Sequence, residues 1–199
     1  WTPTKSNAGQ QTFRAEWQGT DLGEFTLHLP GRFNLANVAA AMATSLASGA
    51  SPRTFAQTIE TFRGIWRRFE ILADGTVTVV SDYAHHPTAV AATIASVRQF
   101  SPGRRIVAVF QPHHHHRLTA LLTPFAQALA GADVTIVSEV YAVLGREGAA
   151  GMKTSRDLVV AVQQQGGANV FHAADPAAAE ALVDHHIQPG DVVLVMGAG

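Results

Sequence analysis

The chain of 199 residues contains no cysteine, which excludes disulfide bonds and thiolate metal ligands and fits a reducing compartment. It also lacks an apolar run of about eighteen residues and a basic-then-apolar leader, so we predict neither a membrane span nor a signal peptide. Neither sign of charge dominates, because the formal net charge is -1. We therefore expect a cytoplasmic protein with no membrane or nucleic-acid partner.

Several common catalytic motifs are missing as well. The sequence has no GxxxxGK(S/T) phosphate loop, no GxSxG nucleophile elbow and no HExxH metal-binding helix. Taken alone, the chain therefore lacks the segment that would hold the phosphate tail of a nucleoside triphosphate. The chain also starts at Trp1 without a methionine and stops at Gly199, directly after an apolar strand, so we expect it to be a piece of a longer protein.

Hydrophobic residues make up 47% of the chain, enough to form a substantial core. The pattern of residues 13–29 predicts a β-hairpin, and two helices are expected over 34–48 and 52–62, which together make a small α+β unit. From residue 70 onward, strands alternate with helices, which favours an α/β fold with a doubly wound, mostly parallel sheet. The expected elements are a hairpin at 71–81, strands at 105–110, 134–138, 169–172 and 192–195, and helices at 88–100, 118–130, 155–165 and 176–185.

Two of these strands run directly into polar clusters. The residues DYAHHP occupy positions 82–87, and QPHHHHR occupies positions 111–117. Ligands in open α/β sheets bind where parallel strands end, so the two clusters predict one polar site for an anionic, phosphorylated substrate.

The four consecutive histidines, 113–116, allow three interpretations. A metal site is one, but adjacent residues on one loop cannot all point at one ion. A strand-end loop that grips phosphate or carboxylate together with Arg117 is the second, and solvated loop residues are the third. Asp82 could serve a ribose hydroxyl, a metal-bound water or a helix cap, although Thr88 is an equally good cap for the following helix.

Two further pairs are candidate binding residues. Arg67 and Arg68 lie between Trp66 and Phe69 at the expected domain boundary, and arginine suits planar recognition of phosphate. Asn34 and Asn37 lie near a helix start. Capping explains Asn34 equally well, but an amide also matches the edge of an adenine ring.

Several segments together resemble the Mur ligases, the ATP-dependent amide-forming enzymes of peptidoglycan synthesis. Residues 30–37, PGRFNLAN, are similar to the PGxHNxxN element of that family, and residues 62–70, FRGIWRRFE, to its FxGxxRRxE junction. Residues 82–88, DYAHHPT, and 110–117, FQPHHHHR, resemble DYxHHPT and FQPHxxxR, the motifs of the branch that joins L-alanine to UDP-N-acetylmuramate. Phe33 and His114 depart from the pattern, because the family usually has His and Arg there.

The resemblance implies that residues 1–67 are the end of a central ATP-binding domain and that residues 68–199 are a Rossmann-like C-terminal domain, truncated at its end. ATP and Mg²⁺ would be bound mainly by an upstream part that carries the phosphate loop, and the fragment alone would be inactive. An acyl phosphate of UDP-N-acetylmuramate would be attacked by L-alanine. A tripeptide-recycling ligase of the same family, a metal-dependent hydrolase that uses His and Asp, and a non-catalytic binding module remain as alternatives.

The resemblance also implies roles for individual residues. Asn34 and Asn37 would lie near adenine, Arg67 or Arg68 near the ATP phosphates, and Asp82 near the ribose. The expected catalytic residues are His85, His113 and Arg117, the expected substrate-binding residues are Tyr83, His86 and His114, and no resident metal ligand is expected.

Overall fold

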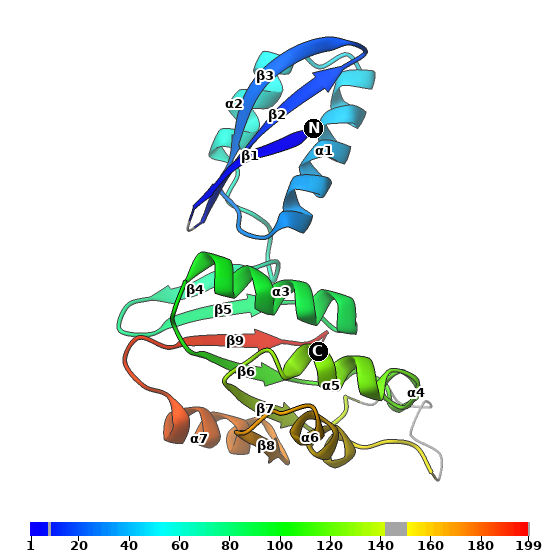
Figure 1. Cartoon of the computed structure of the whole chain (residues 1–199), viewed down its shortest axis with the longest axis vertical. Coiled ribbons are helices and arrows are strands. Elements are labelled where there is room, and N and C mark those ends of the chain that lie inside the picture. The colour runs from blue at the N-terminus through cyan, green and yellow to red at the C-terminus, as the bar shows by residue number, and fades with distance from the viewer. Residues whose placement is uncertain (8, 142–150, 199) are drawn as a thin grey trace.

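The computed structural model describes residues 1–7, 9–141 and 151–198 and contains two units, each built on its own sheet (Figure 1). The first unit has a three-stranded sheet and the second a six-stranded sheet. No helix in the described part of the chain is both long and apolar enough to cross a membrane.

The first unit is an antiparallel sheet with two helices on one face (Figure 1). Its elements are β1 (Thr2–Asn7), β2 (Gln10–Trp17), β3 (Thr20–Leu27), α1 (Arg32–Ala47) and α2 (Pro52–Thr61). The expected hairpin corresponds to β2 and β3, whose inward side chains meet the helices in a core that includes Phe13, Phe25, Leu27, Leu35 and Ile59.

The starts of the two helices differ in how well the sequence marks them. α2 is capped as expected, because the Ser51 hydroxyl accepts a hydrogen bond from the backbone N–H of Thr54 at 3.1 Å. α1 begins at Arg32, earlier than expected, after Gly31 at φ 88°, and no side chain caps it. Asn34 therefore lies inside the first turn rather than at the helix start.

The second unit confirms the expected α/β fold with a mostly parallel sheet. Its strand order is β4-β5-β9-β6-β7-β8, and each neighbouring pair is parallel except β4 with β5, which form the expected hairpin. The strands are β4 (Glu70–Asp74), β5 (Thr78–Asp82), β6 (Ile106–Phe110), β7 (Val134–Ser138), β8 (Val170–Ala173) and β9 (Val192–Met196). The helices are α3 (Pro87–Phe100), α4 (His115–Ala120), α5 (Leu122–Leu129), α6 (Ser155–Gln164) and α7 (Pro176–His186).

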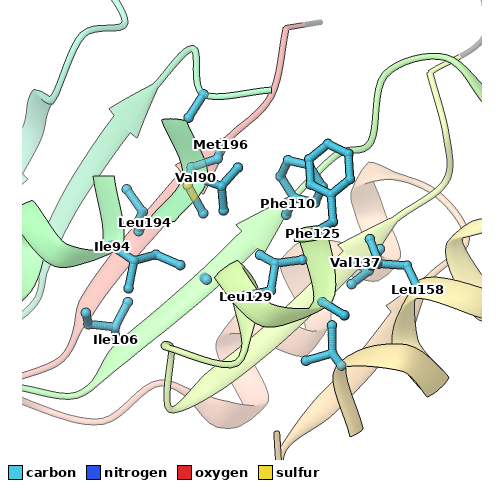
Figure 2. Close-up of a cluster of buried hydrophobic side chains, with 14 of the residues drawn as sticks. Val90, Ile94, Ile106, Phe110, Phe125, Leu129, Val137, Leu158, Leu194 and Met196 are labelled. Atoms are coloured by element: carbon cyan, nitrogen blue, oxygen red, sulfur yellow. The ribbon is translucent and has the colours of Figure 1, made fainter. Parts of the chain in front are cut away.

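Helices cover both faces of this sheet (Figure 1). α3, α5 and α6 pack side by side on one face, and Figure 2 shows the apolar side chains that fill the space between them and the strands. α7 packs on the other face, against β6, β7 and β8. Most side chains of the central strands are buried, which explains continuous apolar runs such as VVLVM in β9, where Val195 alone is exposed.

Two expectations about the helices were wrong. The helix expected over 118–130 is two helices that meet at Leu121, because Pro124 has no N–H to donate to the carbonyl of Ala120. α3 begins at Pro87 and is capped by His86, whose Nδ1 accepts the Thr88 N–H at 3.4 Å. Thr88 is therefore not the cap.

The two units touch beside the segment that joins them. A Cβ atom built on Gly31 would lie 2.5 Å from the Ser96 hydroxyl oxygen on α3, and one on Gly9 would lie 3.1 Å from the Phe100 ring. The backbone N–H of Tyr83 also donates to the Arg67 carbonyl at 2.8 Å. The start of α1 thus lies close to α3, and the junction is bonded to the residue that follows β5.

Candidate functional site

An apolar cavity of about 630 Å³ lies between α1, α2 and the junction. Its polar residues include Asn34, Asn37 and Arg68. Asn34 Nδ2 donates to the Pro30 carbonyl at 2.7 Å, and Asn37 Nδ2 donates to Asn34 Oδ1 at 3.3 Å, so the two amides are held in place. An apolar cavity with a few fixed polar groups suits a small-molecule ligand.

A cluster of aromatic and imidazole rings follows the ends of β5 and β6. The Tyr83 and His85 rings meet edge to face with centroids 5.0 Å apart, and the His85 and His113 centroids are 6.5 Å apart. The His114 ring meets the His113 ring edge to face, with centroids 4.1 Å apart. The Tyr141 ring stacks on the His113 ring, with centroids 5.1 Å apart. The structure therefore brings together residues that the two polar clusters place far apart in the sequence.

One hydrogen bond fixes the tautomer of His85. Its Nδ1 lies 2.9 Å from the carbonyl oxygen of Tyr83. A carbonyl oxygen can only accept, so Nδ1 of a neutral His85 carries the proton and Nε2 carries the lone pair. His85 is thus arranged to accept a proton at Nε2.

Two buried polar atoms in the same region have no hydrogen-bond partner in the described residues, namely His113 Nδ1 and Arg117 Nη1. Burial, together with the nearby His114, Arg117 and His85, lowers the pKa of His113 below its usual value. Buried polar groups of folded proteins are normally paired, and leaving one unpaired costs about 1–3 kcal/mol. Both atoms are therefore open to a hydrogen-bonding partner that residues 1–7, 9–141 and 151–198 do not supply.

The two junction arginines have different surroundings. Arg67 Nη2 donates to the carbonyl of Gly197 at 2.6 Å, and its guanidinium lies 5.6 Å from the Trp66 ring centroid and 5.2 Å from that of Tyr83. Arg68 also lies over Tyr83, at 5.4 Å, but in addition it lines the apolar cavity. Arg67 therefore ties the junction to the end of β9, whereas Arg68 connects the cavity to the ring cluster.

The structure does not support the ribose contact expected for Asp82. This residue is 4% exposed, and its two carboxylate oxygens accept the backbone N–H groups of Phe69 and Ala84, each at 2.8 Å. Burial raises the pKa of Asp82, and those two hydrogen bonds oppose the rise. Asp82 stabilises the backbone around the site, where Phe69 adopts a φ of 48°.

The histidine run is not one loop, because its members lie in different elements. His113 forms a parallel bridge with Tyr141, His114 has a φ of 68° before α4, and His115 and His116 form the first turn of α4. His115 Nδ1 lies 3.0 Å from the Lys153 carbonyl. Among residues 1–7, 9–141 and 151–198, no group of three or more His, Cys, Asp or Glu is placed to hold a metal ion.

Sequence reasoning did not include two side chains of this region, and it gave a third, His86, no role in capping a helix. Tyr141 and Trp66 make the ring contacts described above, although neither was expected in the site. Tyr141 follows the end of β7. Ligands in open α/β sheets bind where parallel strands end, so the sequence could have pointed to Tyr141 as it did to the residues after β5 and β6. His86 is exposed, and its side chain caps α3.

Comparisons with known proteins agree with this architecture. Residues 67–199 match the family described as Mur ligase, glutamate ligase domain. The chain is 35% identical over 198 residues to the UDP-N-acetylmuramate--L-alanine ligase of Caldanaerobacter subterraneus subsp. tengcongensis. The aligned residues are 98% of this chain and 42% of that protein. The enzyme of the same name from Methylococcus capsulatus is 38% identical over 195 residues, which are 96% of this chain and 41% of that protein.

A solved structure shows the same relationship. The UDP-N-acetylmuramate-alanine ligase of Thermotoga maritima superposes with a TM-score of 0.81 and 25% identity over 98% of this chain and 41% of that one. The present chain thus spans about two fifths of the length of these relatives. The family match over residues 67–199 and these likenesses over nearly the whole chain show that it belongs to the Mur ligase family.

Proposed function

We propose that this chain is part of an ATP-dependent ligase that joins L-alanine to UDP-N-acetylmuramate in peptidoglycan synthesis. The names of the relatives that are 35% and 38% identical support this proposal. In it, residues 1–67 are the end of the central ATP-binding domain, and residues 68–199 are most of the C-terminal domain. The reaction consumes ATP and a UDP-sugar, which places it in the cytoplasm.

The observation that carries the proposal is the pair of unpartnered buried atoms, His113 Nδ1 and Arg117 Nη1, in the described part of the chain. Amide formation from an acyl phosphate places negative charge on the carbonyl oxygen under attack. Preorganised donors aimed at such an oxygen stabilise the transition state. In our proposal, His113 and Arg117 are these donors, and Tyr83 and His114 contact the substrates beside them.

The apolar cavity is the proposed place for adenine. Asn34 and Asn37 supply amide groups at its edge, and Arg68 extends from the cavity toward the ring cluster. Arg68 is therefore the better candidate for a phosphate contact than Arg67, which is bonded to the Gly197 carbonyl. Because the chain has no phosphate loop, ATP and Mg²⁺ would be held mainly by residues outside it.

His85 is the proposed proton acceptor for the incoming amine. When the nitrogen of L-alanine attacks the acyl carbon, the carbon–nitrogen bond forms, inorganic phosphate leaves and one proton must leave the nitrogen. His85 Nε2 carries a lone pair because Nδ1 is bonded to the Tyr83 carbonyl. The proton therefore moves to His85 Nε2.

A kinetic comparison on the whole protein that contains this chain tests the proposal. Phosphate release is measured with ATP, UDP-N-acetylmuramate and either L-alanine or the tripeptide L-Ala-D-Glu-diaminopimelate. We expect turnover with L-alanine, little with the tripeptide, and none from the 199-residue chain alone. Preference for the tripeptide, or alanine-dependent turnover by the isolated chain, would contradict the proposal.

A further inference from the structure

Tyr141 holds His113 from several directions at once. Its ring stacks on the imidazole with centroids 5.1 Å apart and an angle of 15° between the planes. Its backbone N–H donates to the Pro112 carbonyl at 2.8 Å, and its carbonyl accepts the His114 N–H at 3.1 Å. These two bonds form a parallel bridge between His113 and Tyr141 just past the ends of β6 and β7.

The backbone at this point needs such support. Pro112 precedes His113, and His114 follows with a φ of 68°, a conformation that few residues other than glycine adopt. Strain of this kind persists only where surrounding contacts enforce it. The bridge to Tyr141 supplies backbone hydrogen bonds on both sides of His113, so it fixes the main chain from which the imidazole projects, and the stacked ring limits how the imidazole can turn.

The surroundings of the imidazole make the Tyr141 ring the uncharged part of its environment. The groups that face His113 are His85, His114, Arg117 and Tyr141. The first three are cationic or become cationic on protonation, whereas Tyr141 presents the face of an aromatic ring. The ring therefore keeps water from one face of the imidazole without adding charge.

We propose that Tyr141 is a positioning residue, which orients His113 so that Nδ1 meets the substrate oxygen and shields this imidazole from water. The inference rests on the proposed function, because it assigns His113 to the substrate cleft. Tyr141 itself is 44% exposed, so its ring contributes little to the core. Its loss should therefore alter His113 far more than it alters the stability of the fold.

The first experiment measures His113 in the chain without substrate. Histidine-labelled protein is titrated by NMR, with the His113 signals assigned by their absence from His113→Gln. Tyr141→Phe keeps the stacked ring, and we expect it to match the parent. Tyr141→Leu removes the ring, and we expect the His113 midpoint to rise by about half a pH unit or more as water reaches the imidazole.

A matched control comes from the same segment. Glu139→Gln removes a carboxylate that contacts His172 at 2.7 Å rather than His113, so it should leave the His113 titration unchanged. An unchanged His113 midpoint and tautomer in Tyr141→Leu would overturn the proposal. An equal shift in Glu139→Gln would also overturn it, because the effect would then belong to the segment and not to the ring.

The second experiment measures kcat/KM of the whole ligase as a function of pH. We expect Tyr141→Leu to lower kcat/KM at least tenfold and to move the pH profile, and Tyr141→Phe to retain both. Equal losses in both variants, or an unchanged kcat/KM in Tyr141→Leu, would contradict the positioning role. If the parent whole protein shows no ligase activity, the proposed function fails, and the NMR titration still decides whether Tyr141 controls His113.

Discussion

Arg68 lies over the ring of Tyr83, with its guanidinium carbon 5.4 Å from the ring centroid. Because Arg68 also lines the apolar cavity, this contact joins the proposed nucleotide pocket to the imidazole cluster. A ligand or substitution in the cavity can therefore affect the imidazole cluster through the side chain of Arg68, and the reverse also holds. Arg67, its neighbour in sequence, instead binds the Gly197 carbonyl and fixes the junction to β9.

Arg117→Gln should weaken substrate use without weakening the fold. Nη1 of Arg117 is buried without a partner in the described residues, so we expect this atom to contribute little to the stability of the fold. Loss of a buried charge contact to substrate costs about 2–4 kcal/mol, or roughly 30- to 1000-fold in kcat/KM. We expect that loss in the whole ligase, together with an unchanged or higher midpoint in urea unfolding of the chain.

Arg98→Gln is the matched control for that comparison. Arg98 pairs with Asp133 at 2.8 Å and donates to the carbonyls of Arg104 and Gly131, each at 3.0 Å. Asp133 precedes the start of β7, so these contacts lie at the opposite edge of the sheet from the imidazole cluster. The loss of Arg98 should cost about 1–3 kcal/mol of stability and leave kcat/KM unchanged. A large loss of stability in Arg117→Gln would show that Arg117 supports the fold rather than the substrate.

His114→Arg should lower the KM for UDP-N-acetylmuramate or L-alanine. His114 contacts His113 and stands where the family usually has arginine, so the substitution adds a fixed positive charge beside the cleft. A charge-assisted hydrogen bond gains about 1.5 kcal/mol, which corresponds to roughly a tenfold lower KM. The comparison is made at pH 8, where an ordinary histidine is neutral. Unchanged KM values for both substrates would show that position 114 does not contact them.

Stability of the chain should fall as the pH drops from 7 through 6. The pKa values of His113 and His186 are lowered from 6.5 by burial and nearby positive groups. Near pH 6.5 the unfolded chain therefore binds protons that the folded chain does not yet bind. The contribution of these two histidines to the free energy of unfolding is complete above that pH and is lost progressively below it. Urea unfolding at several pH values measures the slope. We expect His113→Gln and His186→Gln each to flatten it, and an unchanged slope in both variants would refute the assignment.

Gly31→Ala should open the contact between the two units. The added Cβ would lie 2.5 Å from Ser96 Oγ in the second unit and 2.7 Å from the Phe33 ring in the first, and Gly31 has a φ of 88°. Gly19→Ala is a control with a similar φ of 78° and no atom within 4 Å, so it reports the backbone cost alone, about 1–2 kcal/mol. We expect a larger loss for Gly31→Ala, partly recovered when Ser96→Ala is added. Equal losses at both glycines would mean that the contact is not tight.

The regular elements were predictable because their apolar patterns are strong. The central strands carry continuous apolar runs, and Ser51-Pro52 marks the start of α2. β1 was missed because its sequence, TPTKSN, has no apolar alternation and becomes a strand only by pairing with β2. The break at Leu121 was missed because the apolar spacing continues through it. Pro124 lies in the first turn of α5, where proline is tolerated, so it marks the start of a second helix.

The site was predictable in outline but not in the roles of its side chains. Strand ends pointed to His85 and His113, and the structure places their rings 6.5 Å apart. The burial of Asp82 against two backbone N–H groups depends on Phe69, which is distant in sequence, so no local pattern reveals it. Tyr141 meets His113 only because β6 and β7 lie side by side, which is a property of the sheet and not of either segment.

The central position of β9 affects how the second unit can fold. β9 inserts between β5 and β6, so the sheet cannot close until residues 192–196 have been synthesised. Before then, the nascent chain exposes two apolar strand edges, which are prone to pair with other chains. A premature stop or cleavage before Val192 would leave the same two edges open. The Gly197 carbonyl that binds Arg67 would also be lost, so the junction would no longer be bonded to the end of β9.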